Sequence, residues 1–218
     1  GEIVGDLLTY GGIFMVVGIV GYAVTTMEPE ERDRIIAILL LLPASILFWA
    51  FFEQTGTSIA LFAKRGVDLQ LFGLAVAPAQ IQSINPAFII LLAPFFAALW
   101  VVLSKKGWDP SIPTKFALAL VQMGLGFYMF FLGIESAAEG EEVAFIWLIL
   151  GFFFHTTGEL CLSPVGLSAV TKLSIPKIMG LMMGVWFLAT AFANYAAGLI
   201  AKTSSADTAP GENVPVEQ

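Results

Sequence analysis

Charge is the property that this sequence has least of. Only 12% of its 218 residues are Asp, Glu, Lys or Arg, whereas 58% are hydrophobic, and the mean hydropathy is +0.87. A soluble domain carries roughly 25% charged residues, which cover its water-facing surface. Because this sequence has about half that share, its composition excludes an ordinary soluble domain and predicts an integral membrane protein.

Basic residues, cysteine and histidine are also few. There are 10 Lys and Arg against 17 Asp and Glu, and the net charge of −7 argues against nucleic acid as a partner, because phosphate contacts need clustered basic side chains. The single cysteine, Cys161, excludes a disulfide framework and a cysteine-rich metal site. The single histidine, His155, cannot form a conventional zinc site by itself, so we expect no metal.

Long apolar runs dominate the chain instead. About 20 helical residues cross the hydrocarbon core of a bilayer, and six segments are long enough: 7–24, 35–63, 79–103, 116–134, 143–171 and 178–201. After Lys202 the sequence has no apolar periodicity, which predicts a polar loop or tail. Six spans are half of a common transporter size and the chain begins with Gly1, so we expect a segment of a longer protein.

The basic residues indicate an orientation. If the chain starts outside, seven basic residues fall on one side of the membrane: Arg32, Arg34, Lys105, Lys106, Lys115, Lys172 and Lys177. The other side receives three: Lys64, Arg65 and Lys202. Cytoplasmic loops carry the excess of Lys and Arg. We therefore expect the side with seven to be cytoplasmic and both ends of the segment to face outward.

Glu159 is the first of two carboxylates at membrane depth, where a charge costs at least about 2.5–3.5 kcal/mol. His155 lies one helical turn before it and Ser163 one turn after it, so the spacing predicts that all three share a face, ahead of Pro164. This pattern is typical of a cation-binding or protonatable site facing a water-filled path. A protonated Glu bonded to a neighbouring helix is an alternative, and a hydrolytic pair of Ser163 and His155 is another.

Glu53 is the second such carboxylate. It follows the aromatic run 48–52 and precedes Gln54, in the outer half of the second span. Apolar surroundings disfavour the ionised form of a carboxylate, which makes Glu53 a candidate proton carrier. The alternative is an interfacial residue that is wetted from outside and paired with Lys64 or Arg65.

Asn85 and Trp186 each allow two interpretations. Asn85 precedes Pro86, which is typical of a helix start with Asn as N-cap. If the helix begins nearer Ala79, however, Asn85 lies inside it and could bind a ligand. Trp186 lies deep in the sixth span, where it either packs in the core or forms the wall of an apolar substrate pocket.

Four stretches resemble signatures of the proton-coupled oligopeptide transporters (POT/PTR family), a branch of the major facilitator superfamily. The stretch GELCLSPVGLSAVTKL at 158–173 resembles the tenth helix of these proteins. FWAFFEQTGTS at 48–58 resembles the seventh helix, QSINPAF at 82–88 the eighth, and MGLMMGVWFLATA at 179–191 the eleventh. The four occur in the family's order and cover most of 48–199.

The resemblance implies an all-α membrane fold, namely an incomplete C-terminal six-helix bundle of a major facilitator superfamily transporter. Residues 1–27 would form an accessory transmembrane helix, 35–202 five spans of the bundle (helices seven to eleven), and 203–218 the polar loop or tail. Helix twelve and the N-terminal six-helix bundle would lie outside this segment.

The resemblance also implies a role for individual residues. Glu159 matches the glutamate that receives the α-ammonium group of the peptide, and Asn85 matches the asparagine that helps to hold that group. Ser163 matches a neighbouring pocket residue, and Trp186 matches the tryptophan that lines the pocket. Glu53 matches the acidic residue of helix seven that is implicated in proton coupling. No family role is implied for His155.

The function implied is a proton-dependent symporter of di- and tripeptides in the bacterial inner membrane, working by alternating access. Protons would be the coupling ion, with no cofactor and no enzymatic activity. Its partners would be the peptides, the lipid bilayer and the N-terminal bundle, which would supply the cation for the peptide carboxylate. A carrier of non-peptide solutes on the same scaffold is an alternative, as is an intramembrane serine hydrolase that uses Ser163.

Overall fold

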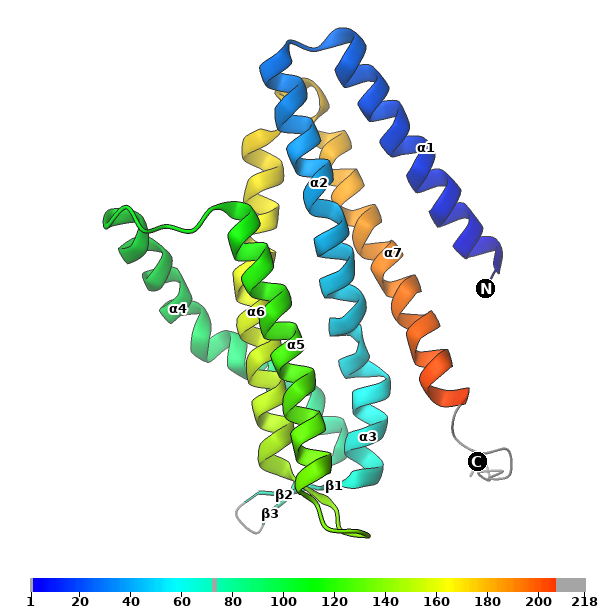
Figure 1. The fold of residues 1–218 in the computed structure, drawn as a ribbon, viewed down its shortest axis with the longest axis vertical. Helices are drawn as coiled ribbons and strands as arrows, with labels where there is room; N and C mark the ends of the chain where they lie inside the picture. The colour runs from blue at the N-terminus through cyan, green and yellow to red at the C-terminus, as the bar shows by residue number, and fades with distance from the viewer. Residues whose placement is uncertain (1, 72–73, 207–218) are drawn as a thin grey trace.

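The computed structural model describes residues 2–71 and 74–206, which form an elongated bundle of helices (Figure 1). Six helical stretches are long and apolar enough to cross a membrane, which confirms the six predicted spans. The helices are listed in chain order: α1 (Glu2–Thr26), α2 (Pro29–Phe52), α3 (Ser58–Gly66), α4 (Ile84–Lys105), α5 (Ile112–Ser136), α6 (Phe145–Leu173) and α7 (Met179–Ala206).

Three short 3₁₀ turns modify this pattern. The second predicted span is broken into α2 and α3 by η1 (Glu53–Gly56), where the sequence places its two polar interruptions. A longer turn, η2 (Pro78–Ser83), leads into α4, and η3 (Pro176–Ile178) leads into α7. At the other end of the chain α7 extends to Ala206, so the first residues of the predicted polar tail are helical, and 207–218 lie outside the described residues.

Local sequence signals explain several helix ends. Pro29 occupies the first position of α2, where its missing N–H costs nothing. The Ser111 hydroxyl caps α5 by accepting a hydrogen bond from the Thr114 backbone N–H. After α4 the chain turns at Gly107, whose φ of 72° favours glycine.

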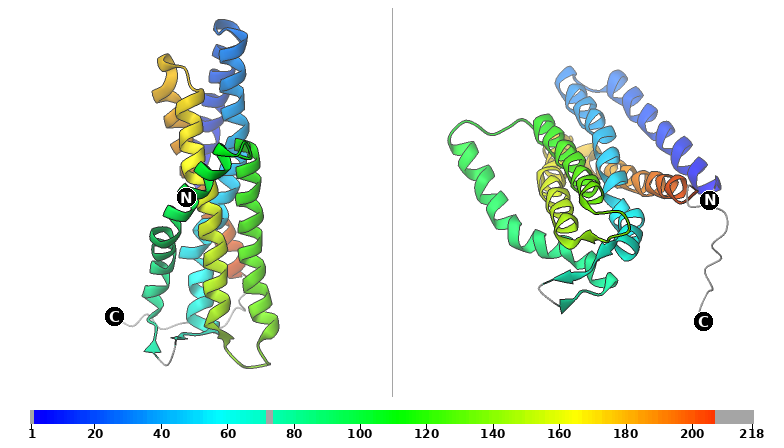
Figure 2. Two further views of the ribbon diagram at one scale, coloured as in Figure 1. Left: turned by 90° about the vertical axis from the view of Figure 1, so that its left-hand side faces the viewer. Right: turned by 60° about the horizontal axis from the view of Figure 1, so that its bottom comes forward.

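The tightest helix pair is α5 with α6, which lie side by side in both figures (Figures 1 and 2). Glycines make this approach possible. A Cβ on Gly126 of α5 would overlap the ring of His155, and a Cβ on Gly151 of α6 would overlap the ring of Phe130. Small residues let helices pack closely in lipid, where no hydrophobic force drives them together. The α5–α6 interface is therefore a closely packed seam.

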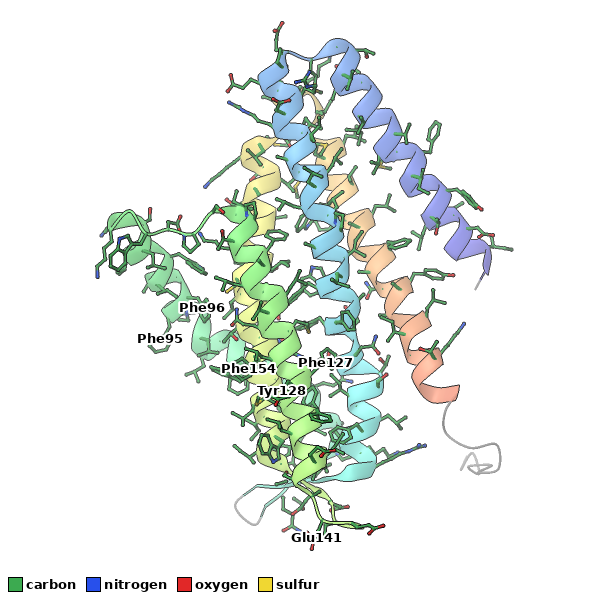
Figure 3. The ribbon with its side chains drawn as sticks, viewed as in Figure 1. Phe95, Phe96, Phe127, Tyr128, Glu141 and Phe154 are labelled. Atoms are coloured by element: carbon green, nitrogen blue, oxygen red, sulfur yellow. The ribbon has the colours of Figure 1, made fainter. Side chains whose placement is uncertain are left out.

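By contrast, α4 diverges from the bundle (Figure 1). None of its residues is buried, and its main packing partner is α6. One aromatic contact joins them, between Phe88 and Phe153, whose ring centroids are 5.8 Å apart. The side-chain view places Phe95 and Phe96 on this diverging helix (Figure 3).

Two pairs of very short strands lie at the end of the bundle where α3 ends and α6 begins (Figure 1). The strand β1 (Val67–Asp68) runs parallel to β4 (Val143–Ala144), which ties the end of α3 to the start of α6. The strands β2 (Gln70–Leu71) and β3 (Leu74–Ala75) pair antiparallel. The acidic connection between α5 and α6, which contains Glu141, lies at the same end (Figure 3).

Candidate functional site

The site is centred on Asn85 of α4 and Glu159 of α6. The Asn85 Nδ2 donates hydrogen bonds to Glu159 Oε2 at 3.0 Å and to Thr156 Oγ1 at 3.1 Å. The Thr156 hydroxyl in turn donates to the Phe152 carbonyl at 2.7 Å. Two helices that diverge elsewhere are thus joined by a polar cluster near the start of α4.

The position of Asn85 decides between its two interpretations. Ser83, not Asn85, is the N-cap of α4, so the prediction of an N-cap role is wrong. The reason is η2, which continues into α4 and places Asn85 inside the helical run. Because its amide is not needed for capping, it is available to reach across to α6.

Glu159 is half-buried, and no Lys or Arg of the described residues forms an ion pair with it. Within 2–71 and 74–206, only its Oε2 receives a hydrogen bond. The one basic side chain that is buried in this part of the chain, Lys115, pairs instead with Asp109 at 2.8 Å. A carboxylate held in this way has a second oxygen that can accept a hydrogen bond from a cationic donor.

Glu53 and Asn85 line the same hollow of about 230 Å³, between the break in the second span and the start of α4. Its other lining residues are Phe52, Thr55, Gly56, Gln82, Pro86 and Phe152. The alternative of an ion pair with Lys64 or Arg65 is not formed among the described residues. Glu53 thus lines the hollow, whereas Glu159 does not; the link between them is Asn85, which lines the hollow and donates a hydrogen bond to Glu159.

His155 and Glu159 lie one turn apart on α6, as their spacing predicts, but they contact different neighbours. The His155 ring is completely buried against α5, with its centroid 5.0 Å from that of Phe127 and 5.6 Å from that of Phe130. Residues four apart on a helix are offset by about 40° around its axis. With this offset, His155 packs against α5 and Glu159 contacts Asn85 of α4. Ser163 is half-buried, and the described contacts include no hydrogen bond between it and His155.

Trp186 is packed in the core. It is 6% exposed, its ring meets the ring of Phe116 edge-on with centroids 6.4 Å apart, and it fills the space that a Cβ on Gly166 would need. This is the first of its two predicted interpretations. A role in a pocket wall stays a prediction.

Sequence reasoning missed Thr156 and Gln82. Thr156 lies three residues before Glu159, on the face that meets Asn85, and this spacing could have revealed it. Gln82 enters the hollow only because η2 brings it beside Pro86. The 3₁₀ turn itself left no clear signal in the sequence.

Known proteins that resemble this chain are transporters. A peptide transporter of Yersinia enterocolitica, YePEPT, is 38% identical over 188 residues, which are 85% of this chain and 37% of YePEPT. Dipeptide and tripeptide permease A of Escherichia coli is 36% identical over 188 residues, which are 86% of this chain and 37% of the permease. The chain thus spans well under half the length of these relatives.

Solved structures agree in fold. A crystal structure of a peptide transporter POT in complex with sulfate matches 93% of this chain and 43% of its own, with a TM-score of 0.75 and 39% identity. A POT family transporter in complex with a thioalcohol conjugated peptide matches 94% of this chain and 43% of its own, with a TM-score of 0.81 and 29% identity. The PTR2 family model, which describes the POT family, matches residues 7–215. The chain is therefore a membrane protein that belongs to the POT family of transporters, not to a family of enzymes.

Proposed function

We propose that this chain forms the C-terminal part of a proton-driven symporter of di- and tripeptides, on the major facilitator superfamily scaffold, in a bacterial inner membrane. Residues 1–27 are the accessory helix and 35–202 five helices of the C-terminal bundle. The peptide permeases among the relatives support this substrate class. The excess of basic residues at the ends of the helices joined by the α1–α2, α4–α5 and α6–α7 connections supports a cytoplasmic location for those ends.

The Asn85–Glu159 pair carries the proposal. In it, Glu159 receives the α-ammonium group of the peptide, and Asn85 fixes the carboxylate and accepts a hydrogen bond from the same group. An ammonium group has three N–H donors. The half-buried Glu159 carboxylate, which has no ion-pair partner among the described residues, can accept hydrogen bonds from such a group. Ser163, one turn further along α6, extends the pocket. Trp186 supports the pocket wall, because its ring packs against Gly166 of α6.

Glu53 is the proton-coupling residue in this proposal. It begins η1, at the edge of the hollow that it shares with Asn85. Phe52 and Phe152 line the same hollow, so the Glu53 carboxylate lies beside apolar as well as polar side chains. Protonation of Glu53 and arrival of the peptide amine would then act on adjoining parts of one site. The proton is the only coupling ion required.

The rest of the site comes from a partner bundle. A dipeptide also has a carboxylate, and the described pocket offers no cation for it. An N-terminal six-helix bundle of the same transporter would supply that cation, and rocking of the two bundles would alternate access across the bilayer. Residues 1–218 alone should therefore fail to transport. Uptake of a labelled dipeptide by liposomes that contain only this segment would contradict this part of the proposal.

The amine assignment is tested by Glu159→Gln in a complete transporter that contains this segment. We expect loss of proton-driven dipeptide uptake in proteoliposomes by about a hundredfold, because a charge-assisted contact of about 3 kcal/mol disappears. The control is Glu141→Gln, which alters an exposed loop carboxylate outside the site. Near-normal uptake by Glu159→Gln, or strong competition by a peptide without its α-amine, would refute the assignment.

A further inference from the structure

Gln54 is a buried polar residue at the break between α2 and α3. Only 2% of it is exposed, and it lies within η1, directly after Glu53. At this break the backbone leaves helical geometry at Thr57, where φ is −124° and ψ is −94°, before α3 begins at Ser58. A buried carboxamide costs free energy unless its donors and acceptors are matched, so its partners show what it does.

Both the nitrogen and the oxygen of the Gln54 carboxamide have hydrogen-bond partners. Its Nε2 donates to the Ala50 carbonyl at 3.1 Å and to the Ala197 carbonyl of α7 at 3.2 Å. Its Oε1 accepts from the Thr57 hydroxyl at 3.3 Å and from the Ser58 hydroxyl at 3.0 Å. One side chain therefore binds the end of α2, the start of α3 and the middle of α7.

This arrangement fixes the direction of the neighbouring side chain. Consecutive residues in a 3₁₀ turn point about 120° apart. With Gln54 held on the α7 side, Glu53 is directed to the other side, where it lines the hollow with Asn85. At the far end of α3 the β1–β4 pairing fixes Val67 beside Val143. The hydrogen bonds of Gln54 thus attach the first residue of α3, Ser58, to α7 at a point next to the Glu53 carboxylate.

We propose that Gln54 is a positioning residue for Glu53: by tying the α2–α3 break to the Ala197 carbonyl of α7, it holds the Glu53 carboxylate at the hollow that contains Asn85. This inference rests on the proposed proton-coupling role of Glu53. It adds that this carboxylate is held from α7 through its neighbour in η1.

The test uses Gln54→Met in a complete transporter, since methionine keeps the length and volume of the side chain but removes all four hydrogen bonds. Thr57→Val is a milder second variant, which removes one hydroxyl donor while keeping the branched shape. The matched control is Gln122→Met. The Gln122 Nε2, like that of Gln54, donates two hydrogen bonds, here to the Leu118 carbonyl and to the Cys161 sulfur, but Gln122 lies on α5, away from the break.

Two measurements report on the proposal. We expect proton-driven dipeptide uptake by Gln54→Met to fall about tenfold, with a shifted pH dependence, while gradient-free counterflow exchange changes by less than about threefold. Spin labels at the exposed positions Leu61 of α3 and Leu199 of α7 should give a broader distance distribution in Gln54→Met than in the parent protein. Thr57→Val should change both in the same direction by less, and Gln122→Met should change neither.

Distances and a pH profile that match the parent would overturn the inference. Equal loss of counterflow and proton-driven uptake would overturn it too, because that pattern marks a general loss of folding or binding. Failure of the proposed function has a different signature, namely normal proton-driven uptake by Glu53→Gln. If Glu53→Gln is defective in proton-driven uptake and Gln54→Met is normal, the positioning role of Gln54 is refuted while the proposed role of Glu53 stands.

Discussion

The two faces of α6 differ in kind. The face towards α5 is closely packed, with Gly126 and Gly151 allowing contact with His155 and Phe130. The face towards α4 carries a polar cluster, in which Asn85 donates hydrogen bonds to Glu159 and Thr156. A single helix thus combines a closely packed seam with the proposed binding surface, and the seam fixes the helix on which that surface depends.

The largest expected effect comes from filling the seam. Gly126→Leu should destabilise the protein by about 3 kcal/mol or prevent folding, because the added side chain has no space beside the His155 ring. The control is Gly124→Leu on the same helix, where a Cβ meets nothing within 4 Å. Thermal unfolding in detergent measures both. Equal stability of the two variants would show that the seam is looser than described.

The second effect concerns the polar face. Asn85→Leu should weaken dipeptide binding by about tenfold, because it removes one hydrogen bond to the peptide amine and the fixed orientation of Glu159. Competition for labelled dipeptide uptake by a complete transporter measures this. Asn194→Ala, an exposed asparagine on α7, is the control. Unchanged competition by Asn85→Leu would remove Asn85 from the binding site.

The sequence was sufficient to predict the spans but not the partners within the site. Hydropathy over about 20 residues locates six helices because membrane depth imposes length and apolarity on each of them separately. The Asn85–Glu159 bond joins residues 74 positions apart, and no local pattern encodes that separation. The family resemblance named both residues, yet the choice between capping and binding for Asn85 depended on the backbone of η2.

Two further outcomes show where local patterns fail. The spacing of His155 and Glu159 correctly predicts neighbours on α6, but a small angular offset places them against different helices. Gln54 stood out in the sequence only as an interruption of an apolar run. Its burial arises because Ala197 of α7 offers a carbonyl to it, a contact between residues 143 positions apart.

A smaller effect is expected from His155→Leu, which separates packing from proton chemistry on α6. The His155 ring is completely buried against two phenylalanine rings, and within 2–71 and 74–206 neither ring nitrogen makes a hydrogen bond of good geometry, so a leucine of similar volume should change stability by less than about 1.5 kcal/mol. Proton-driven uptake by a complete transporter should stay within about twofold of the parent. A large loss of uptake with preserved stability would place His155 in the transport mechanism and blur the contrast between the two faces.

The smallest effect is expected from replacing the basic pair at the end of α3. Lys64→Gln together with Arg65→Gln should leave the pH dependence of uptake unchanged, because neither side chain pairs with Glu53 among the described residues. Exposed ion pairs contribute only about 0–1 kcal/mol in any case. The comparison is Glu53→Gln, which should abolish the pH dependence under the proposed coupling role. If the double variant reproduced the Glu53→Gln profile, Glu53 would belong to an outer charge network instead of the hollow beside Asn85.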